Sequence, residues 1–230
     1  MKILKYKKKA NGKYSLFLDD GREFVYYEET ILQYNLLLKK EIDESELLLI
    51  HQTNLEYDVY YVALNSIKNR SRSVYELKTI LLKKEYPPEM VDKAIDKLIK
   101  QKYLDDRSFA KSYIYTQMVT TSHGPNRIRG DLIQKKVSSS IIEEEMEIYT
   151  EEEQKERIQK LIEKGIRSNH NRGGLVLKQK IVNDLKNQGF DYDIISSVIM
   201  HLIFLIIKKL RKKNMKNIIE NIVVNMRGMN

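Results

Sequence analysis

Three stretches of this chain carry the same pattern of apolar residues, and this repetition limits the possible fold more than any other feature. The second stretch follows the first at an offset of 51 residues and the third follows the second at 53, without a gap inside the matched region. The spacing within each stretch is helical, so the sequence predicts three units of about 50 residues whose helices pack on one another. The matched sets are Leu77, Ile128 and Ile181; Leu81, Leu132 and Leu185; Tyr86, Val137 and Phe190; Met90, Ile141 and Ile194; Val91, Ile142 and Ile195; Ile95, Met146 and Ile199.

The middle copy shows how each unit is divided into helices. Asp105 can cap a new helix, and Asp106 suits the positive end of that helix's dipole. Apolar residues then follow at helical spacing up to the polar run 120–123. Gly124 and Pro125 should end this helix and begin the next one, because proline is tolerated in the first turn of a helix but not in its interior.

The third copy opens with a capping signal and closes with an apolar run. Thr150 and Glu153 can satisfy each other's free backbone amides at the start of a helix. The run Val198–Ile207 is shorter than the roughly 20 residues that a membrane span needs. Ser196, Ser197 and His201 lie in or beside it. We therefore expect a buried helix with a basic extension rather than a membrane helix.

Before the repeats, the N-terminal segment reads as a small antiparallel sheet. The alternating runs KILKYKK, KYSLFL and REFVYY are separated by Asn11-Gly12 and Asp20-Gly21. Both dipeptides accept the positive φ of tight hairpin turns, so a three-stranded meander is predicted. A sheet of this size is not stable alone and should dock on the helices that follow.

The segment between this sheet and the repeats should be helical. Thr30 is expected to cap a short helix that runs through Leu38. Asp43 or Ser45 is expected to open a longer helix toward Lys68, with a break within residues 53–56. The predicted organisation is 1–40 sheet and short helix, 41–56 connecting helix, 57–103, 104–149 and 150–207 three-helix repeats, and 208–230 basic extension.

No constellation of residues indicates catalysis. The histidines His51, His123, His170 and His201 fall at no metal-ligand spacing, and the chain has neither a P-loop nor a dinucleotide-binding fingerprint. Asp105, Asp106 and Asp131 are better explained as capping and surface residues than as ligands of Mg²⁺, which requires carboxylates held together with phosphate or water. The sequence therefore predicts a protein that is not an enzyme and needs no metal or cofactor.

The charge of the chain is compatible with a polyanionic partner but does not by itself indicate one. The net charge of +9 makes nucleic acid a possible ligand, and the lack of cysteine suits a reducing cytosol. Two cations also recur between copies, Lys78 as Arg129 and Lys84 as Lys135. Such recurrence is expected of a repeated contact surface and equally of a solvated helix face; we adopt the contact hypothesis, because arginine meets phosphate and carboxylate in bidentate geometry. The predicted contact residues are Arg70, Arg72, Lys78, Lys84, Arg107, Lys111, Arg127, Arg129, Lys135 and Lys136.

Several motifs resemble the RecX family, regulators of the RecA recombinase. They are YLDDRSFAKSY at Tyr103–Tyr113, the helix start GPNRI at Gly124–Ile128, and RSRS at Arg70–Ser73 followed by Glu76 and Leu77. LKQKIVNDLKNQGFDYDII at 177–195 resembles the family's third repeat, and the resemblance covers about residues 57–200. The apolar and then basic segment 204–230 departs from relatives, which tend to end in acidic and polar sequence.

The resemblance implies a mainly α-helical protein in which tandem three-helix repeats form an elongated, curved array. It also implies a cytoplasmic, non-enzymatic protein that binds in the groove of the RecA–DNA filament. There such a protein mainly inhibits recombinase, ATPase and coprotease activity in DNA repair and the SOS response. Single-stranded and double-stranded DNA are possible further partners, and no membrane is implied. The alternative is a free-standing DNA-binding transcription regulator whose helix after Gly124 enters a major groove; the lack of an acidic cluster argues against a nuclease.

Overall fold

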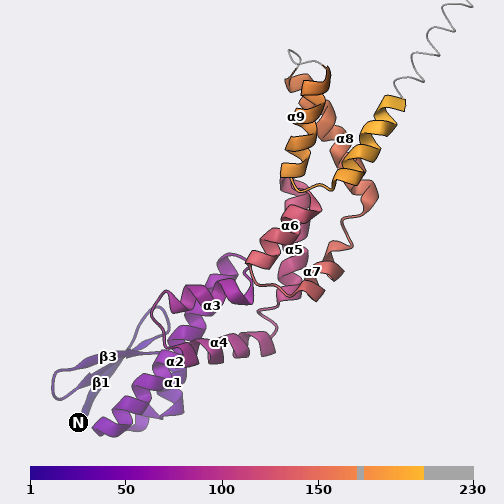
Figure 1. The fold of residues 1–230 in the computed structure, drawn as a ribbon. Helices are drawn as coiled ribbons and strands as arrows, with labels where there is room; N and C mark the ends of the chain where they lie inside the picture. The colour runs from indigo at the N-terminus through magenta and orange to yellow at the C-terminus, as the bar shows by residue number, and fades with distance from the viewer. Residues whose placement is uncertain (170–173, 205–230) are drawn as a thin grey trace, which may run out of the picture. The chain divides into compact units, whose positions relative to one another are not determined.

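The computed structural model of the protein describes residues 1–169 and 174–204, which are mainly helical with one small sheet (Figure 1). These residues form two compact units. The first comprises Met1–Phe109 together with Lys135–Val137, and the second begins with Ala110–Gln134 and resumes at Ser138. The fold class expected from the sequence, helical repeats preceded by an antiparallel sheet, is confirmed.

The sheet in the first unit has the predicted meander topology. Strands β1 (Ile3–Lys8), β2 (Tyr14–Leu18) and β3 (Glu23–Tyr26) pair antiparallel in the order β1-β2-β3. Gly12 and Gly21 have φ values of 79° and 85°. This is the positive φ that the two turn dipeptides were predicted to adopt. One face of the sheet contributes Leu16, Leu18 and Tyr26 to a core that also includes residues of the following helices.

The segment after the sheet corrects two predictions. Helix α1 (Glu28–Gln33) has Tyr27 at its N-cap, and a 3₁₀ turn (Leu36–Leu38) follows it. Thr30 is therefore no cap; it is buried inside α1, where its hydroxyl donates to Asn54 Oδ1 at 3.2 Å.

Helix α2 (Glu44–Asn69) begins at the predicted Asp43 cap, whose carboxylate accepts from the Glu46 amide at 2.7 Å. It runs unbroken through residues 53–56, so the predicted break was wrong. Polar residues in this part of α2 instead contact the sheet side of the unit, because Asn54 Oδ1 accepts the Tyr27 amide at 2.9 Å.

A half-buried carboxylate joins the sheet side of the first unit to its helices. Asp58 on α2 accepts hydrogen bonds from the hydroxyls of Tyr27 at 2.7 Å and Tyr86 at 2.6 Å. The Lys13 ammonium lies 3.7 Å from the same carboxylate and 3.8 Å from the centroid of the Tyr27 ring. These contacts explain how a sheet too small to be stable alone is held in place.

Three groups of three helices follow the order that the repeat predicts. In the first group α2 is followed by α3 and α4, in the second α5 by α6 and α7, and in the third α8 by α9 and a helix within 192–204 (Figure 1). Pro125 begins α6, and the Thr150–Glu153 capping box begins α8, as predicted. The bounds are α3 Val74–Leu82, α4 Pro88–Lys100, α5 Asp106–Thr120, α6 Pro125–Gln134, α7 Ser139–Met146, α8 Glu151–Ser168 and α9 Gly174–Asn187.

Four of the six matched sets share their burial as well as their residue type. The sets that begin with Leu77, Leu81 and Val91 are buried in all three copies, and the set that begins with Met90 is half-buried in all three. Agreement in intermediate burial is informative, because a chance match of amphipathic helices would reproduce only the buried stripe. The repeat is therefore a structural one.

The backbone repeats too, at the residue that ends the second helix of each copy. Glu85, Lys136 and Gly189 stand at equivalent positions, and their φ values are 64°, 58° and 93°. A left-handed residue after a helix lets the last carbonyls find partners, and glycine adopts this conformation most easily. In two copies this residue is charged, Glu85 and Lys136. The repeat of apolar residues therefore did not predict that the backbone conformation would also repeat.

The described end of the third copy corrects another prediction. Val198 is buried, but Met200, Ile203 and Phe204 are 64%, 41% and 62% exposed, so the expected buried helix is open along its last turns. The predicted extension 208–230 lies outside the described residues. Among the helices of residues 1–169 and 174–204, none has the length and apolar character needed to cross a membrane.

Candidate functional site

The N-terminus of α3 forms a polar junction with residues far away in the sequence. Ser73 and Glu76 form a capping box, and the Ser73 hydroxyl also donates to the Lys135 carbonyl at 2.9 Å. The Lys135 ammonium lies 2.5 Å from Glu76, and both side chains are only about one-fifth exposed. Asp106 accepts the Val74 amide at 2.9 Å. Lys135, predicted as a contact residue, is thus engaged within the protein.

The electrostatics of this junction follow from its partners. Burial raises the pKa of Glu76, but the ammonium of Lys135 and the Ser73 amide outweigh it, so the pKa is lowered. Burial raises the pKa of the Asp106 carboxyl, opposed by the Val74 amide and assisted by the charges of Asp105 and Glu76. The junction therefore favours the ionised form of Glu76 and disfavours the ionised form of Asp106.

The recurrence of Lys78 as Arg129 reflects a repeated ion pair. The Lys78 ammonium lies 2.5 Å from Asp92, which joins α3 to α4. Arg129 Nε lies 3.1 Å from Glu143, which joins α6 to α7. Asp92 and Glu143 are themselves 51 residues apart, so the whole pair recurs. That recurrence of the acid was the signal in the sequence that could have identified the pair.

The remaining predicted residues do not form one cluster. Arg70, Lys84, Arg107, Lys111, Arg127 and Lys136 are exposed, and Arg72 is half-buried with its Nε donating to the Ser66 carbonyl at 3.3 Å. In the first compact unit lie Arg70, Arg72, Lys78, Lys84, Arg107, Lys135 and Lys136, and in the second lie Lys111, Arg127 and Arg129. Among the ion pairs described for residues 1–169 and 174–204, none involves Arg70, Lys84, Lys111, Arg127 or Lys136.

A second joint, in the second unit, covers the N-terminus of α6. The Gly124 amide donates to the Gln188 carbonyl at 2.7 Å, and the Asn126 amide donates to the Gly189 carbonyl at 3.0 Å. Gly124 and Gln188 are the repeat equivalents of Ser73 and Lys135, so this joint corresponds to the one at α3. A Cβ on Gly124 would lie 2.6 Å from the Gly189 backbone, which explains why glycine stands there.

Basic and aromatic residues that the sequence analysis did not single out line a groove between α5 and α8. The groove has a volume of about 680 Å³ and includes predicted Lys111 together with Tyr115, Arg157 and Lys160. Tyr115 is 65% exposed. Arg157 donates to the Tyr149 hydroxyl at 3.4 Å and to the Met118 carbonyl, which fixes its guanidinium at the groove wall. The exposed Tyr115 ring suits stacking against a base, whereas Glu153 and Glu156, which also line the groove, oppose the contact of its cations with phosphate.

The acidic residues considered for Mg²⁺ each have a structural partner. Asp105 accepts the Ser108 amide at 3.0 Å, which confirms it as the cap of α5. Asp106 accepts a hydrogen bond from the Val74 amide, and Asp131 accepts one from the Tyr113 hydroxyl at 3.0 Å. Over residues 1–169 and 174–204, no three histidine, aspartate or glutamate side chains gather as a metal site would require.

Comparison with known proteins gives consistent matches. Residues 60–98 match the family model described as RecX, first three-helix domain, and residues 105–146 match RecX, second three-helix domain. The regulatory protein RecX of Listeria monocytogenes serovar 1/2a is 32% identical over 192 residues, which cover 83% of this chain and 71% of that protein. The regulatory protein RecX of Oceanobacillus iheyensis is 30% identical over 200 residues, which cover 85% and 74%.

Two crystal structures are similar to the chain in fold. A structure of regulatory protein RecX matches with a TM-score of 0.72 and 28% identity, covering 86% of this chain and 98% of the other. RecX from Lactobacillus salivarius matches with a TM-score of 0.62 and 28% identity, covering 66% and 99%. The similarity thus extends beyond the two regions that match family models.

Proposed function

The chain belongs to the RecX family of regulatory proteins, and from this premise we propose that it acts by stoichiometric binding in the groove of a RecA–DNA filament. Bound there, it inhibits recombinase, ATPase and coprotease activity during DNA repair and the SOS response, without catalysis of its own. Such a partner implies a cytoplasmic location. Single-stranded or double-stranded DNA within the filament is a further contact.

The observation that carries this proposal, beyond the family, is the division of the basic residues into two classes. Lys78, Arg129 and Lys135 hold parts of the protein together through carboxylates. Lys84 and Arg127 are exposed, and no ion pair is described for either within residues 1–169 and 174–204. Exposed cations at helix ends in both compact units can neutralise phosphates along a polyanion, and this releases counterions.

The free-standing transcription regulator fits the structure less well. Recognition helices of the helix-turn-helix type contact bases through residues near their N-termini. The N-terminus of α6 is instead engaged by Gln188 and Gly189, and the Arg127 backbone packs against Gly189. Entry of that helix end into a major groove would require the joint to open.

The primary experiment is cosedimentation with RecA. We expect the protein to sediment with RecA filaments assembled on DNA and not with RecA alone, and to lower RecA-dependent ATP hydrolysis. It should show no preference among duplex sequences. A site bound at least about 10³-fold more tightly than bulk DNA, with no effect on RecA, would favour the transcription regulator instead.

A matched pair of double variants tests the two classes of cation. Lys84→Ala with Arg127→Ala removes one exposed charge from each unit, and Lys78→Ala with Arg129→Ala removes one ion-paired charge from each. The first variant should weaken filament binding and flatten its dependence on salt, because fewer counterions are released. The second should bind more nearly as the parent does. Equal binding by both variants and the parent, at low and physiological salt, would show that these cations are only solvated.

A further inference from the structure

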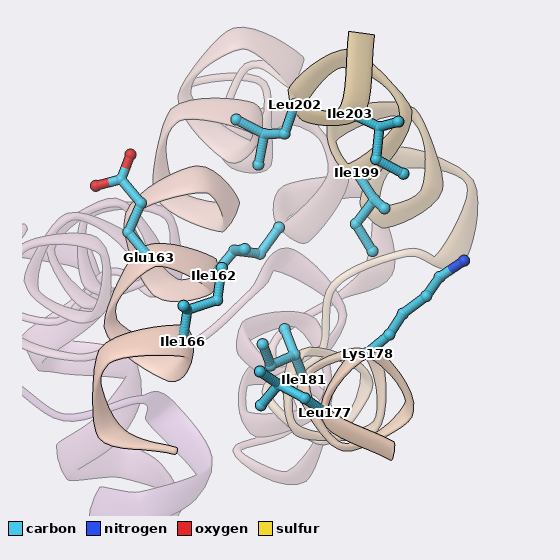
Figure 2. A pocket seen from close by; sticks show the side chains of 9 residues that line it. All are labelled: Ile162, Glu163, Ile166, Leu177, Lys178, Ile181, Ile199, Leu202 and Ile203. Carbon is cyan, nitrogen blue, oxygen red and sulfur yellow. The ribbon is translucent and has the colours of Figure 1, made fainter. Parts of the chain in front are cut away.

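The third copy contains an apolar groove of about 380 Å³ between α8, α9 and the helix within 192–204 (Figure 2). Figure 2 shows aliphatic side chains converging on one space, with the charged ends of Glu163 and Lys178 pointing away from it. The structure describes no residue beyond Phe204, which directly follows the residues that line this groove. What covers the groove is therefore undefined, and we draw no inference from it.

A second exposed aliphatic surface lies in the first unit, where the 3₁₀ turn meets the start of α2. Leu37 and Leu38 in the turn are 46% and 84% exposed, and Leu49 on α2 is 55% exposed. A single exposed leucine is ordinary on a protein surface. Several leucines exposed at one place instead mark a surface that contacts a partner.

Contacts at both ends of the segment 34–39 hold it against α2. The Tyr34 hydroxyl donates to the Leu49 carbonyl at 3.3 Å, and Lys39 forms an ion pair with Glu46. The two exposed leucines of the turn lie between these contacts and therefore beside Leu49. We use the name leucine patch for Leu37, Leu38 and Leu49.

The neighbouring Leu48 is 69% exposed but lies on another face of α2. It follows Glu44 by four residues and shares its face, on which Glu44 forms an ion pair with Arg22 of the sheet segment. Leu49 follows Glu46 by three residues and shares the face that meets the segment 34–39. Two adjacent leucines on one helix thus differ in whether they belong to the leucine patch.

The chemistry of the leucine patch suits a protein better than a nucleic acid. Aliphatic side chains offer neither a donor for a phosphate nor a ring on which a base can stack. Lys39 and Glu46, which tie the patch together, neutralise each other. The patch therefore fits an uncharged, apolar surface of a partner protein.

The size of the patch argues against a second copy of the chain as the partner. Three leucines fall well short of the roughly 800 Å² per partner that a stable dimer buries. Such a patch is instead suited to be the apolar part of a larger interface. A RecA–DNA filament offers an interface of this kind, because it presents protein subunits together with DNA.

We propose that the leucine patch contacts an apolar surface of a RecA subunit in the filament, while the exposed cations of the chain contact the DNA. This inference rests on the proposed function and adds to it the surface that binds the protein component of the filament. Burial of the leucines contributes affinity that does not depend on salt, whereas the cations determine the salt dependence.

Three single variants of the full-length chain test the proposal by cosedimentation with RecA filaments assembled on single-stranded DNA. Leu38→Asp and Leu49→Asp place a charge in the leucine patch, and Leu48→Asp places the same charge on the other face of α2. We expect each patch variant to bind about tenfold or more weakly than Leu48→Asp, which should bind as the parent does. Because an apolar contact releases no counterions, this difference should be the same at low and at physiological salt.

The outcomes separate this inference from the proposed function. Leu38 is so exposed that its substitution should leave the fold intact, which far-ultraviolet circular dichroism of each variant checks. If the parent sediments with filaments and both patch variants bind as Leu48→Asp does, the inference is refuted and the proposed function stands. If the parent does not sediment with filaments, the proposed function itself fails and this inference falls with it.

Light scattering of the protein without RecA tests the other occupant of the patch. We expect a monomer for the parent and for every variant. A dimeric parent that Leu49→Asp converts into monomers, with filament binding unchanged, would show that a second copy covers the leucine patch and would overturn the proposal.

Discussion

Replacing Gly189 with alanine tests the joint between α6 and the end of α9. A Cβ at this position would lie 2.5 Å from the Arg127 amide nitrogen and 2.7 Å from the Arg127 Cβ. The obstacle is largely backbone and cannot rotate away, so α6 and the turn after α9 must move apart. The Gly124 and Asn126 hydrogen bonds to this turn would lengthen at the same time.

The magnitude follows from two effects. Overpacking against a rigid neighbour costs about 1 to 3 kcal/mol. An alanine with φ near 93° costs about 1 to 2 kcal/mol more, offset by the roughly 0.5 to 1 kcal/mol gained because alanine restricts the unfolded chain. We expect Gly189→Ala to lower the free energy of unfolding by about 1 to 4.5 kcal/mol.

The equivalent positions in the other copies should respond with the opposite sign. Glu85 and Lys136 already hold left-handed conformations without the freedom of glycine. Glu85→Gly and Lys136→Gly relieve about 1 to 2 kcal/mol of strain each and lose about 0.5 to 1 kcal/mol through the freer unfolded chain. Each should therefore be neutral or stabilising by up to about 1.5 kcal/mol.

Urea unfolding followed by far-ultraviolet circular dichroism measures these changes. Gly130→Ala is the control, because its Cβ would meet nothing within 4 Å and alanine favours the helix interior by about 1 kcal/mol. If Gly189→Ala were as stable as the parent, or if Lys136→Gly were clearly destabilised, the repeated joint would not have the energetic role inferred here.

Three further measurements test other parts of the structure. Ile128→Ala should cost about 2 to 5 kcal/mol of unfolding free energy through the cavity it leaves in α6, and a cost below about 1 kcal/mol would deny that this side chain is core. Burial and the hydrogen bond to Asp58 raise the pKa of Tyr86 from 10.0 to about 12. The protonated hydroxyl therefore stabilises the fold below pH 10, and this contribution is lost as the pH rises toward 12. The free energy of unfolding should fall less steeply over this pH range in Tyr86→Phe than in the parent, and an equal slope would contradict the contact. Small-angle scattering should give a radius of gyration clearly above the roughly 17 Å of a compact domain of this length, and a value at 17 Å would exclude the elongated array that the resemblance implies.

Local signals predicted most of the fold. The caps at Asp43, Asp105 and Thr150 and the proline at the start of α6 were readable because each acts within four residues along the chain. Thr30 shows where such a signal fails, since its hydroxyl finds Asn54 in another helix. The unbroken course of α2 has the same cause, because the polar residues that suggested a break are satisfied across the unit.

The candidate site was harder to predict than the fold. The sequence identified basic residues but could not divide them into those that bind carboxylates of the same protein and those that remain at the surface. Lys135 meets Glu76 across 59 residues of sequence, and only the packing of α3 determines that distance. Tyr115 and Arg157 were missed because neither lies in a motif, and the groove that they share exists only once α5 and α8 are packed.

By itself the sequence determined the three-copy repeat, the identity of the helices and the side of each helix that is buried, because hydrophobic burial acts through a periodicity that is written along the chain. Tertiary structure alone decided the fate of the charges at Lys78, Arg129 and Lys135, since the energy of an ion pair depends on the distance between groups that packing brings together. It also decided that the last copy carries an open apolar groove. The repeated apolar positions show which residues are hydrophobic, but they do not show whether a neighbouring helix covers them.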